Sequence, residues 1–131
     1  MMKIKISGTY SNVKVLNSPA HTYSVSNPAK LVMSKLTIDN YDCIAINKGS
    51  NIVFQRNSCT GGHGISIGSI SSDVTVSGIT IKDNTITNND QALRIKTKKS
   101  ATGATVSNIT YSGNTGTGLR KFGVLIDQSY P

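Results

Sequence analysis

The sequence contains no tryptophan and no glutamate, and aromatic residues make up only 5% of its 131 positions. No stretch approaches the roughly 20 consecutive apolar residues that cross a bilayer. Residues 1–10 also lack the apolar core of a signal peptide. We therefore expect a soluble chain with no membrane partner and no signal peptide.

Glycine, serine, threonine and asparagine are abundant instead, which favours short strands joined by tight turns over helices. The length and the 37% hydrophobic content predict a single domain over residues 1–131 with a buried core. Fourteen Lys and Arg residues against six Asp residues give a formal charge of +8. This charge predicts an acidic partner, which could be a polysaccharide, a nucleic acid or an anionic membrane surface.

The two cysteines, Cys43 and Cys59, permit one disulfide. Such a bridge would close a short loop and stabilise the fold by about 3 kcal/mol through the unfolded state. It would also imply an oxidising compartment, and so a secreted parent protein. The alternative is that both thiols are free and buried.

Short alternating apolar segments recur along the chain, with starts roughly 20 to 30 residues apart. They are YSV at 23–25, CIAI at 43–46, GISI at 64–67, ALRI at 92–95 and GVLI at 123–126. A second kind of segment precedes each one and ends near an asparagine. These asparagines are Asn17, Asn40, Asn57, Asn84 and Asn114.

Asparagines at one corner of successive coils could stack their amides and adopt the left-handed conformation of a sharp turn. No segment shows helical periodicity, and β-branched residues dominate the apolar positions. The sequence therefore predicts an all-β fold, a right-handed parallel β-helix of about five coils, with loops at 96–103 and 113–121 projecting from its corners.

Several polar residues interrupt this pattern. Arg94 and Lys96 are two positions apart, so on a strand both cations leave the same face and could meet an anion. His63 lies between two glycines, and Asp42 stands at the start of an apolar run. Taken alone, Asp42 could simply cap a turn, His63 could be a core residue, and the two cations could form a solvated face.

Five motifs together give the sequence a resemblance to a known family. They are NSPAHTYSV, DCIAIN, CTGGHGISIGS, RIKT and the terminal GVLIDQSYP. With them the chain resembles the fungal-type endo-polygalacturonases of glycoside hydrolase family 28 from about residue 4 to residue 131. That resemblance implies a β-helix enzyme, extracellular in its parent family, that acts on polygalacturonate in pectin without a metal or other cofactor.

The resemblance also implies roles for individual residues. Asp42 and His63 fall on catalytic positions of the family, and Arg94, Lys96 and Tyr130 on positions that bind substrate. Cys43 and Cys59 fall on a family disulfide.

The sequence departs from the family pattern in its coils and in its carboxylates. The capping coils at the amino end are absent, as is a central coil with an Asn-Thr-Asp motif between residues 40 and 42. Tyr41 stands where the general acid is expected. Inverting hydrolysis needs two carboxyl groups roughly 6.5 to 9.5 Å apart. Asp39 could assist Asp42 across a bent corner, which leaves residual hydrolysis as an alternative.

Three functions therefore compete. We expect a polygalacturonate-binding β-helix with strongly reduced or no hydrolytic activity, and residual inverting hydrolysis by Asp42 with Asp39 is the first alternative. The second is a general polyanion binder, but a nucleic acid is not expected, because aromatics that could stack on bases are lacking. Uncapped end coils also predict end-to-end homo-oligomers.

Overall fold

The computed structural model describes residues 2–18, 22–27, 29–39 and 42–131. All fifteen regular elements in this part of the chain are strands, and their pairings are parallel. No helix of a length and apolarity that could span a bilayer occurs among these residues.

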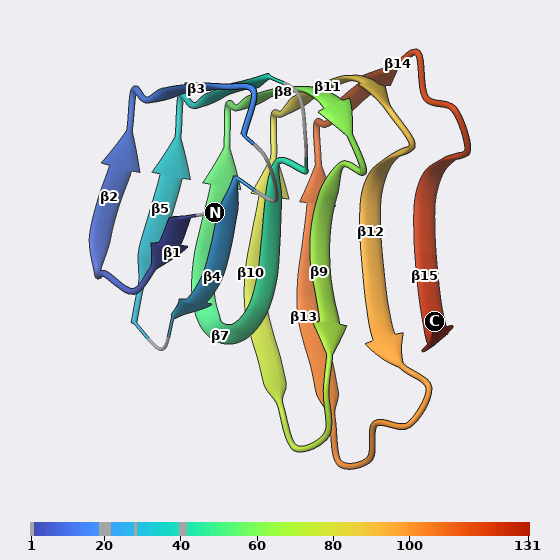
Figure 1. Ribbon diagram of the computed structural model, residues 1–131. Helices are drawn as coiled ribbons and strands as arrows, with labels where there is room; N and C mark the ends of the chain where they lie inside the picture. The colour runs from blue at the N-terminus through green and yellow to red at the C-terminus, as the bar shows by residue number, and fades with distance from the viewer. Residues whose placement is uncertain (1, 19–21, 28, 40–41) are drawn as a thin grey trace.

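The strands form three strips that the chain visits in turn (Figure 1). The front strip contains β1 (Met2–Ile4), β4 (Tyr23–Asn27), the first part of β7 (Ile44–Gln55), β9 (Ile65–Ile70), β12 (Gln91–Lys98) and β15 (Phe122–Tyr130). The second strip contains β2 (Gly8–Ser11), β5 (Leu31–Ser34), the last part of β7, β10 (Thr75–Lys82) and β13 (Thr105–Ser112). The third strip contains β3 (Lys14–Leu16), β6 (Thr37–Asp39), β8 (Ser58–Gly62), β11 (Thr85–Asn89) and β14 (Thr115–Thr117).

Because β7 bends from the front strip into the second, these two strips make one ten-stranded sheet, and the third is a separate five-stranded sheet. The chain passes through all three strips five times, and β15 begins a sixth passage. The predicted right-handed parallel β-helix of about five coils is confirmed.

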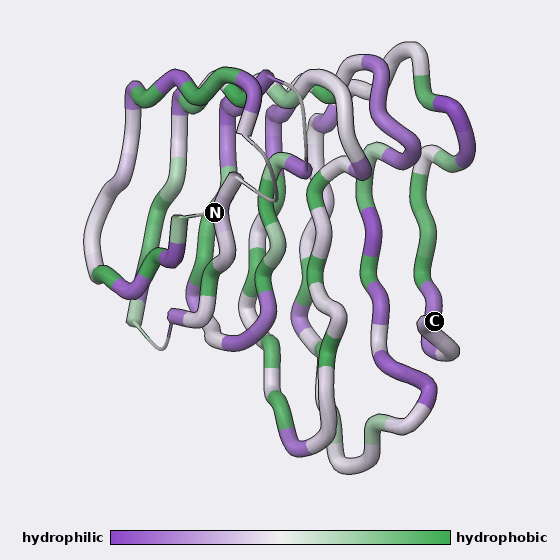
Figure 2. Tube along the Cα trace, viewed as in Figure 1, coloured by the Kyte–Doolittle hydropathy of each residue, from purple (hydrophilic) through white to green (hydrophobic). Residues whose placement is uncertain are grey.

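The five repeated segments of the sequence lie directly above one another in the front strip. Their inward-facing residues are in register: Tyr23, Ile44, Ile65, Leu93 and Val124. The next residue of each strand faces outward, in a row formed by Ser24, Ala45, Ser66, Arg94 and Leu125. Alternation along the strands therefore separates a core row from a surface row. Figure 2 shows hydrophobic and hydrophilic residues alternating along β12, whereas the first half of β15 is mainly hydrophobic.

Isoleucine dominates the core of the coils. Ile44, Ile46, Ile65 and Ile67 are completely buried, and among the described residues the only aromatic side chains buried to the same degree are those of Tyr23 and Phe54. A β-branched side chain loses little rotamer freedom on a strand and packs on the copy one coil away, about 4.8 Å distant. The scarcity of aromatic residues in the sequence follows from this narrow interior.

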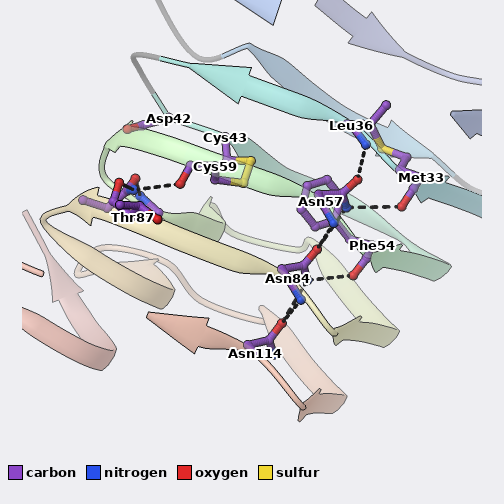
Figure 3. The surroundings of a disulfide bond; sticks show 12 residues. Met33, Leu36, Asp42, Cys43, Phe54, Asn57, Cys59, Asn84, Thr87 and Asn114 are labelled. Carbon is purple, nitrogen blue, oxygen red and sulfur yellow. Dashed lines mark hydrogen bonds between the residues drawn. A yellow bond between two sulfur atoms is a disulfide. The ribbon is translucent and has the colours of Figure 1, made fainter. Parts of the chain in front are cut away.

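A ladder of asparagines closes the corner between the second and third strips (Figure 3). The Asn57 backbone N–H and side-chain Nδ2 both donate to Asn84 Oδ1, at 3.0 and 3.1 Å. Asn84 makes the same pair of bonds to Asn114 Oδ1, at 3.1 and 2.9 Å. The backbone N–H of Leu36 donates to Asn57 Oδ1 at 2.9 Å and ends the ladder. The predicted stacking is thus confirmed for three coils.

Asn17 does not lie at the corner of this ladder, contrary to the prediction of one shared corner, and Asn40 lies outside the described residues. Asn17 follows β3, at the end of the third strip, and has a φ of 54°. The equivalent position on later coils also has positive φ, in Gly61 (66°) and Asn88 (55°). The ladder asparagines do not adopt this conformation, and the residue before each one does, as Arg56 (55°) shows. Asparagine therefore has two separate uses in this fold.

The predicted loops differ in extent from the structure. The segment at 96–103 begins inside β12, which continues to Lys98, so the projecting part is shorter than expected. The segment at 113–121 contains β14 and belongs to the third strip rather than to a free loop.

The disulfide links two strips of one coil. Cys43 directly precedes β7 and Cys59 lies in β8, with 5.6 Å between their Cα atoms (Figure 3). Both residues are buried, so the bridge crosses the interior of the coil. The predicted pairing is present, and the alternative of two free thiols is wrong.

A protein made of these 131 residues alone is expected to associate through its ends. Phe122, Val124 and Ile126 belong to the row that is buried on other coils, yet they are 50 to 65% exposed. The outer edge of β15 has no partner strand among the described residues and can pair with another molecule. Multi-angle light scattering at high micromolar concentration should show dimers or larger species. The double variant Val124→Lys/Ile126→Lys should shift the mass toward the monomer, and a monomeric parent would contradict the prediction.

Candidate active site

An open cleft of about 450 Å³ lies on the outer face of the front strip. It contains all of the predicted catalytic and substrate-binding residues. The residues that line it are Ser24, Asp42, Ala45, Asn47, His63, Gly68, Ser69, Arg94, Lys96 and Tyr130. They come from successive coils, because parallel strands in register bring their outward-facing residues together on one face.

Arg94 and Lys96 project into the cleft from β12. Their alternate positions put both side chains on the outer face, yet each residue is less than 10% exposed, at 8% for Arg94 and 7% for Lys96. Arg94 Nε donates to Ser66 Oγ at 3.1 Å, which orients the guanidinium. Lys96 Nζ lies 4.4 Å from the centroid of the Tyr130 ring, a distance at which the cation interacts with the aromatic face.

The electrostatics of these two cations favour an anionic ligand. Burial lowers the pKa of Lys96, the neighbouring charge of Arg94 lowers it further, and Asp42 opposes the shift. Among the described residues, no carboxylate forms an ion pair with either cation. Desolvated positive charges are costly. Since the pKa of Lys96 stays lowered despite the charge of Asp42, an anion in the cleft would be favourable.

Asp42 and His63 meet across two adjacent coils. The backbone N–H of His63 donates to Asp42 Oδ1 at 2.8 Å, and His63 Nδ1 lies 2.5 Å from the same oxygen. The side chain of Asp42 is only 4% exposed, whereas that of His63 is 48% exposed. Asp42 thus accepts a backbone N–H from the next coil. His63 is a cleft residue and not a core histidine.

The backbone around His63 is fixed by an asparagine that sequence reasoning missed. The N–H of Gly64 donates to Asn89 Oδ1 at 3.0 Å. Asn89 Nδ2 in turn donates to the carbonyl of Thr87 at 2.8 Å and to that of Cys59 at 3.3 Å. Asn89 is completely buried, so it ties the glycine after His63 to the adjacent strands β8 and β11.

A second carboxylate, also missed from the sequence, lies on the other side of the His63 ring. His63 Nε2 is 3.4 Å from Asp90 Oδ2. Asp90 also accepts a hydrogen bond from Arg120 Nε at 2.7 Å and lies 3.3 Å from Lys121 Nζ. The imidazole is thus held between two aspartates, and a protonated His63 could donate to both. Asp90 itself does not line the cleft.

Asp90→Asn is expected to lower the thermal stability by a few degrees at pH 6, as for one partly exposed ion pair. The hydrogen bond from Arg120 is the main cause of a lowered pKa of Asp90. A carboxyl with a lowered folded-state pKa stabilises the fold above its unfolded pKa, and this contribution disappears as the pH falls below about 4. Melting temperatures of the two proteins measured from pH 3 to pH 7 should therefore converge at the acidic end. A constant difference over that range would contradict the ion-pair account.

The carboxylates of the cleft are fewer than inverting hydrolysis requires. Asp42 is the only carboxylate among the described residues that line it. Asp39 pairs with Leu16 and Thr60 in the third strip and does not line the cleft. Tyr41, the predicted replacement of a general acid, lies outside the described residues.

In the described ranges, no three His, Cys, Asp or Glu side chains are grouped so that they could hold a metal ion. Asp42 and Asp90 approach opposite nitrogens of one imidazole instead of converging on a common point.

Known proteins are similar to this chain in both sequence and fold. The sequence profile of the glycosyl hydrolases family 28 matches residues 40–131. An endo-polygalacturonase from Sclerotinia sclerotiorum is 36% identical over 97% of this chain and 42% of that protein. Endopolygalacturonase I from Aspergillus aculeatus is 36% identical over 92% of this chain and 40% of the relative. The solved structure of endopolygalacturonase I from Stereum purpureum, complexed with two galacturonate, is 43% identical, with a TM-score of 0.82 over 98% of this chain and 49% of that one.

The chain spans about two fifths of the length of these relatives and about half of the solved structure. The alignment with the Sclerotinia protein is 160 positions long, more than the 131 residues here, so it includes positions that this chain lacks. This agrees with the shortened pattern expected from the sequence. On the profile match, the identities and the shared fold, the chain belongs to glycosyl hydrolase family 28.

Proposed function

We propose that this chain binds polygalacturonate in the cleft of the front strip and hydrolyses it far more slowly than a relative with a full set of carboxylates. The observation that supports binding is the pair of nearly buried cations, Arg94 and Lys96, which form no ion pair with a carboxylate among the described residues. A uronate carboxylate has the charge and the planar shape that a guanidinium binds. The related Stereum enzyme was solved with two galacturonate.

The side chains around these cations suit a sugar acid. Tyr130 offers an aromatic ring next to Lys96, on which the apolar face of a sugar could rest. Ser24, Asn47 and Ser69 line the same cleft and supply hydroxyl and amide groups for sugar hydroxyls. Asn47 Nδ2 already donates to Ser24 Oγ at 2.9 Å, so its amide oxygen is directed by that bond.

The proposed loss of rate follows from the count of carboxylates. One carboxyl must protonate the leaving oxygen while another activates water on the opposite face of the sugar. Asp42, hydrogen-bonded to His63, can take one of these roles and not both. Losing a general acid or base typically reduces the rate by about 10²- to 10⁴-fold.

The test combines a binding titration with a reducing-sugar assay on polygalacturonate. We expect salt-sensitive binding, at least about tenfold weaker in Arg94→Ala, because a charge-assisted contact contributes about 1.5 to 3 kcal/mol. Lys14→Ala is the matched control, since Lys14 is exposed on the third strip and its loss also removes one positive charge. We expect turnover more than about a hundredfold below the median of roughly 10 s⁻¹ for enzymes. Absence of binding, or ordinary turnover, would refute the corresponding half of the proposal.

Residual hydrolysis by Asp42 with Asp39 is distinguished by one variant. Asp39→Asn would abolish any residual turnover under that alternative and leave it unchanged otherwise. General polyanion binding would appear as equal affinity for single-stranded DNA and for polygalacturonate. The disulfide fits the extracellular location that we propose for the protein, because oxidising compartments preserve such bridges.

A further inference from the structure

The outer face of the front strip continues beyond the cleft toward the amino end, over β7, β4 and β1 (Figure 1). Two further hollows lie there, of about 260 and 460 Å³. Ser24 and Asn47 line both the cleft and the smaller hollow. Lys5 and Ser26 line both hollows. The three depressions therefore share walls and form one trough that runs across the strands.

The amino end of this trough is positively charged. Lys3 and Lys5 line the smaller hollow, and Lys5 and Lys48 line the larger one. All three lysines are exposed, and no carboxylate lines either hollow. None of the ion pairs among the described residues includes any of these lysines.

The register places the two principal lysines on one row. Ile4 pairs with Val25, so Lys5 follows beside Ser26, and Ser26 pairs with Lys48. Lys5 and Lys48 are therefore about two strand spacings, or roughly 10 Å, apart. Lys96 follows Ile95, which aligns through Ile67 with Ile46, so Lys96 lies two coils beyond Asn47, the residue before Lys48. The further distance from Lys48 to Lys96 is therefore at least roughly 10 Å.

The floor between Lys5 and Lys48 is held by the backbone. Asn27 Nδ2 donates to the carbonyls of Ile6 at 2.8 Å and Ala29 at 2.6 Å, so this amide has a structural role. Gly49 has a φ of 122°, and a Cβ there would collide with the Asn27 carbonyl. The close approach of these two coils leaves the lysines and the hydroxyls of Ser26 and Ser50 to contact a ligand.

We propose that Lys5 and Lys48 form a second anion-binding subsite, which takes a carboxylate of the same uronate chain whose neighbouring residues occupy the Arg94–Lys96 cleft. This inference rests on the proposed function. Exposed lysines bind a single carboxylate weakly, but a polymer already held at one end presents its further carboxylates at high effective concentration. The subsite therefore acts on chains long enough to reach across about four strand spacings, roughly 19 Å.

The experiment compares two ligand lengths with two double variants. Digalacturonate and a galacturonate oligomer of eight residues are titrated against the parent, Lys5→Ala/Lys48→Ala, and Lys14→Ala/Lys99→Ala. The last variant loses the same charge outside the trough, because both residues are exposed and neither lines the cleft or the two further hollows. We expect Lys5→Ala/Lys48→Ala to bind the longer ligand about tenfold more weakly, the sum of two exposed ion pairs, and digalacturonate unchanged.

Each other outcome has a distinct meaning. If the longer ligand binds the parent and both double variants equally, the subsite is refuted and the proposed function stands. If the control variant loses as much affinity as Lys5→Ala/Lys48→Ala, the effect is one of net charge and the subsite is again refuted. If neither ligand binds the parent, the proposed function itself fails. A sulfated glucan of similar length that binds as tightly and responds alike would overturn the assignment to uronates.

Discussion

Gly64→Ala is expected to lower the free energy of unfolding by about 4 kcal/mol or more, a large share of the 5 to 15 kcal/mol typical of a domain. Gly64 has a φ of 85°, in the left-handed region that an alanine enters at a cost. A Cβ at this position would also collide with the backbone carbonyls of Gln91 and Ala92 on the next coil. These carbonyls belong to β12, so they cannot move without disturbing its pairing with the neighbouring strands.

Variants of two other glycines separate the cost of the backbone conformation from the cost of the collision. Gly8 has a φ of 112° but open space around its position, so Gly8→Ala reports the backbone strain alone, about 1 to 3 kcal/mol. Gly123 has open space and no positive φ, so Gly123→Ala should change the stability by less than about 0.5 kcal/mol. Urea denaturation of the three variants tests the order. A Gly64→Ala protein no less stable than Gly8→Ala would show that the coils can separate at little cost.

Removal of the disulfide has the second large effect. The double variant Cys43→Ala/Cys59→Ala should lose about 3 kcal/mol, because the bridge closes a loop of 16 residues and restricts the unfolded chain. For a chain of this length the melting temperature should fall by roughly 10 °C. Both sulfur atoms are buried, so their loss also leaves unfilled space in the coil.

Reduction provides the matched control. Dithiothreitol should lower the melting temperature of the parent protein by a similar amount and leave that of the double variant unchanged. If the parent melts at the same temperature with and without the reductant, the bridge does not restrict the unfolded chain as expected. Mass spectrometry after alkylation would show whether the reductant had opened the bond.

The strands could be predicted because their signal is local. Residues 44–46 and 65–67 each place one outward-facing residue between two core isoleucines, and the structure aligns Ile44 with Ile65 and Ile46 with Ile67. The same alternation predicted that Arg94 and Lys96 project from one face of their strand. Their lack of an ion-pair partner among the described residues could not be foreseen, because it depends on which side chains the other coils bring near.

Corners were harder to predict than strands. One asparagine stacks its side chain in a ladder and another adopts a left-handed turn, and the sequence shows the same letter for both. Asn84 has the first role and Asn88 the second, only four residues later. The difference lies in which strip each residue ends, which becomes visible only once the register is known.

The contacts of His63 show most clearly what a local sequence pattern cannot predict. Asp90 precedes β12 without any motif of its own, and Arg120 follows thirty residues later, after β14. The length of one coil brings these two residues together, since coils four and five return the chain to the same edge. A search for charged residues spaced by one coil length would have found the pair.

The in-register stacking of outward-facing residues fixes the spacing of charges along the front strip. Each coil adds about 4.8 Å to the face on which Lys5, Lys48 and Lys96 are spaced. Inserting or deleting a coil changes the distance between these cations in whole steps and leaves the contacts within each coil intact. The length of polymer that could contact two such charges at once is therefore set mainly by the number of coils between them, and only secondarily by the chemistry at either one.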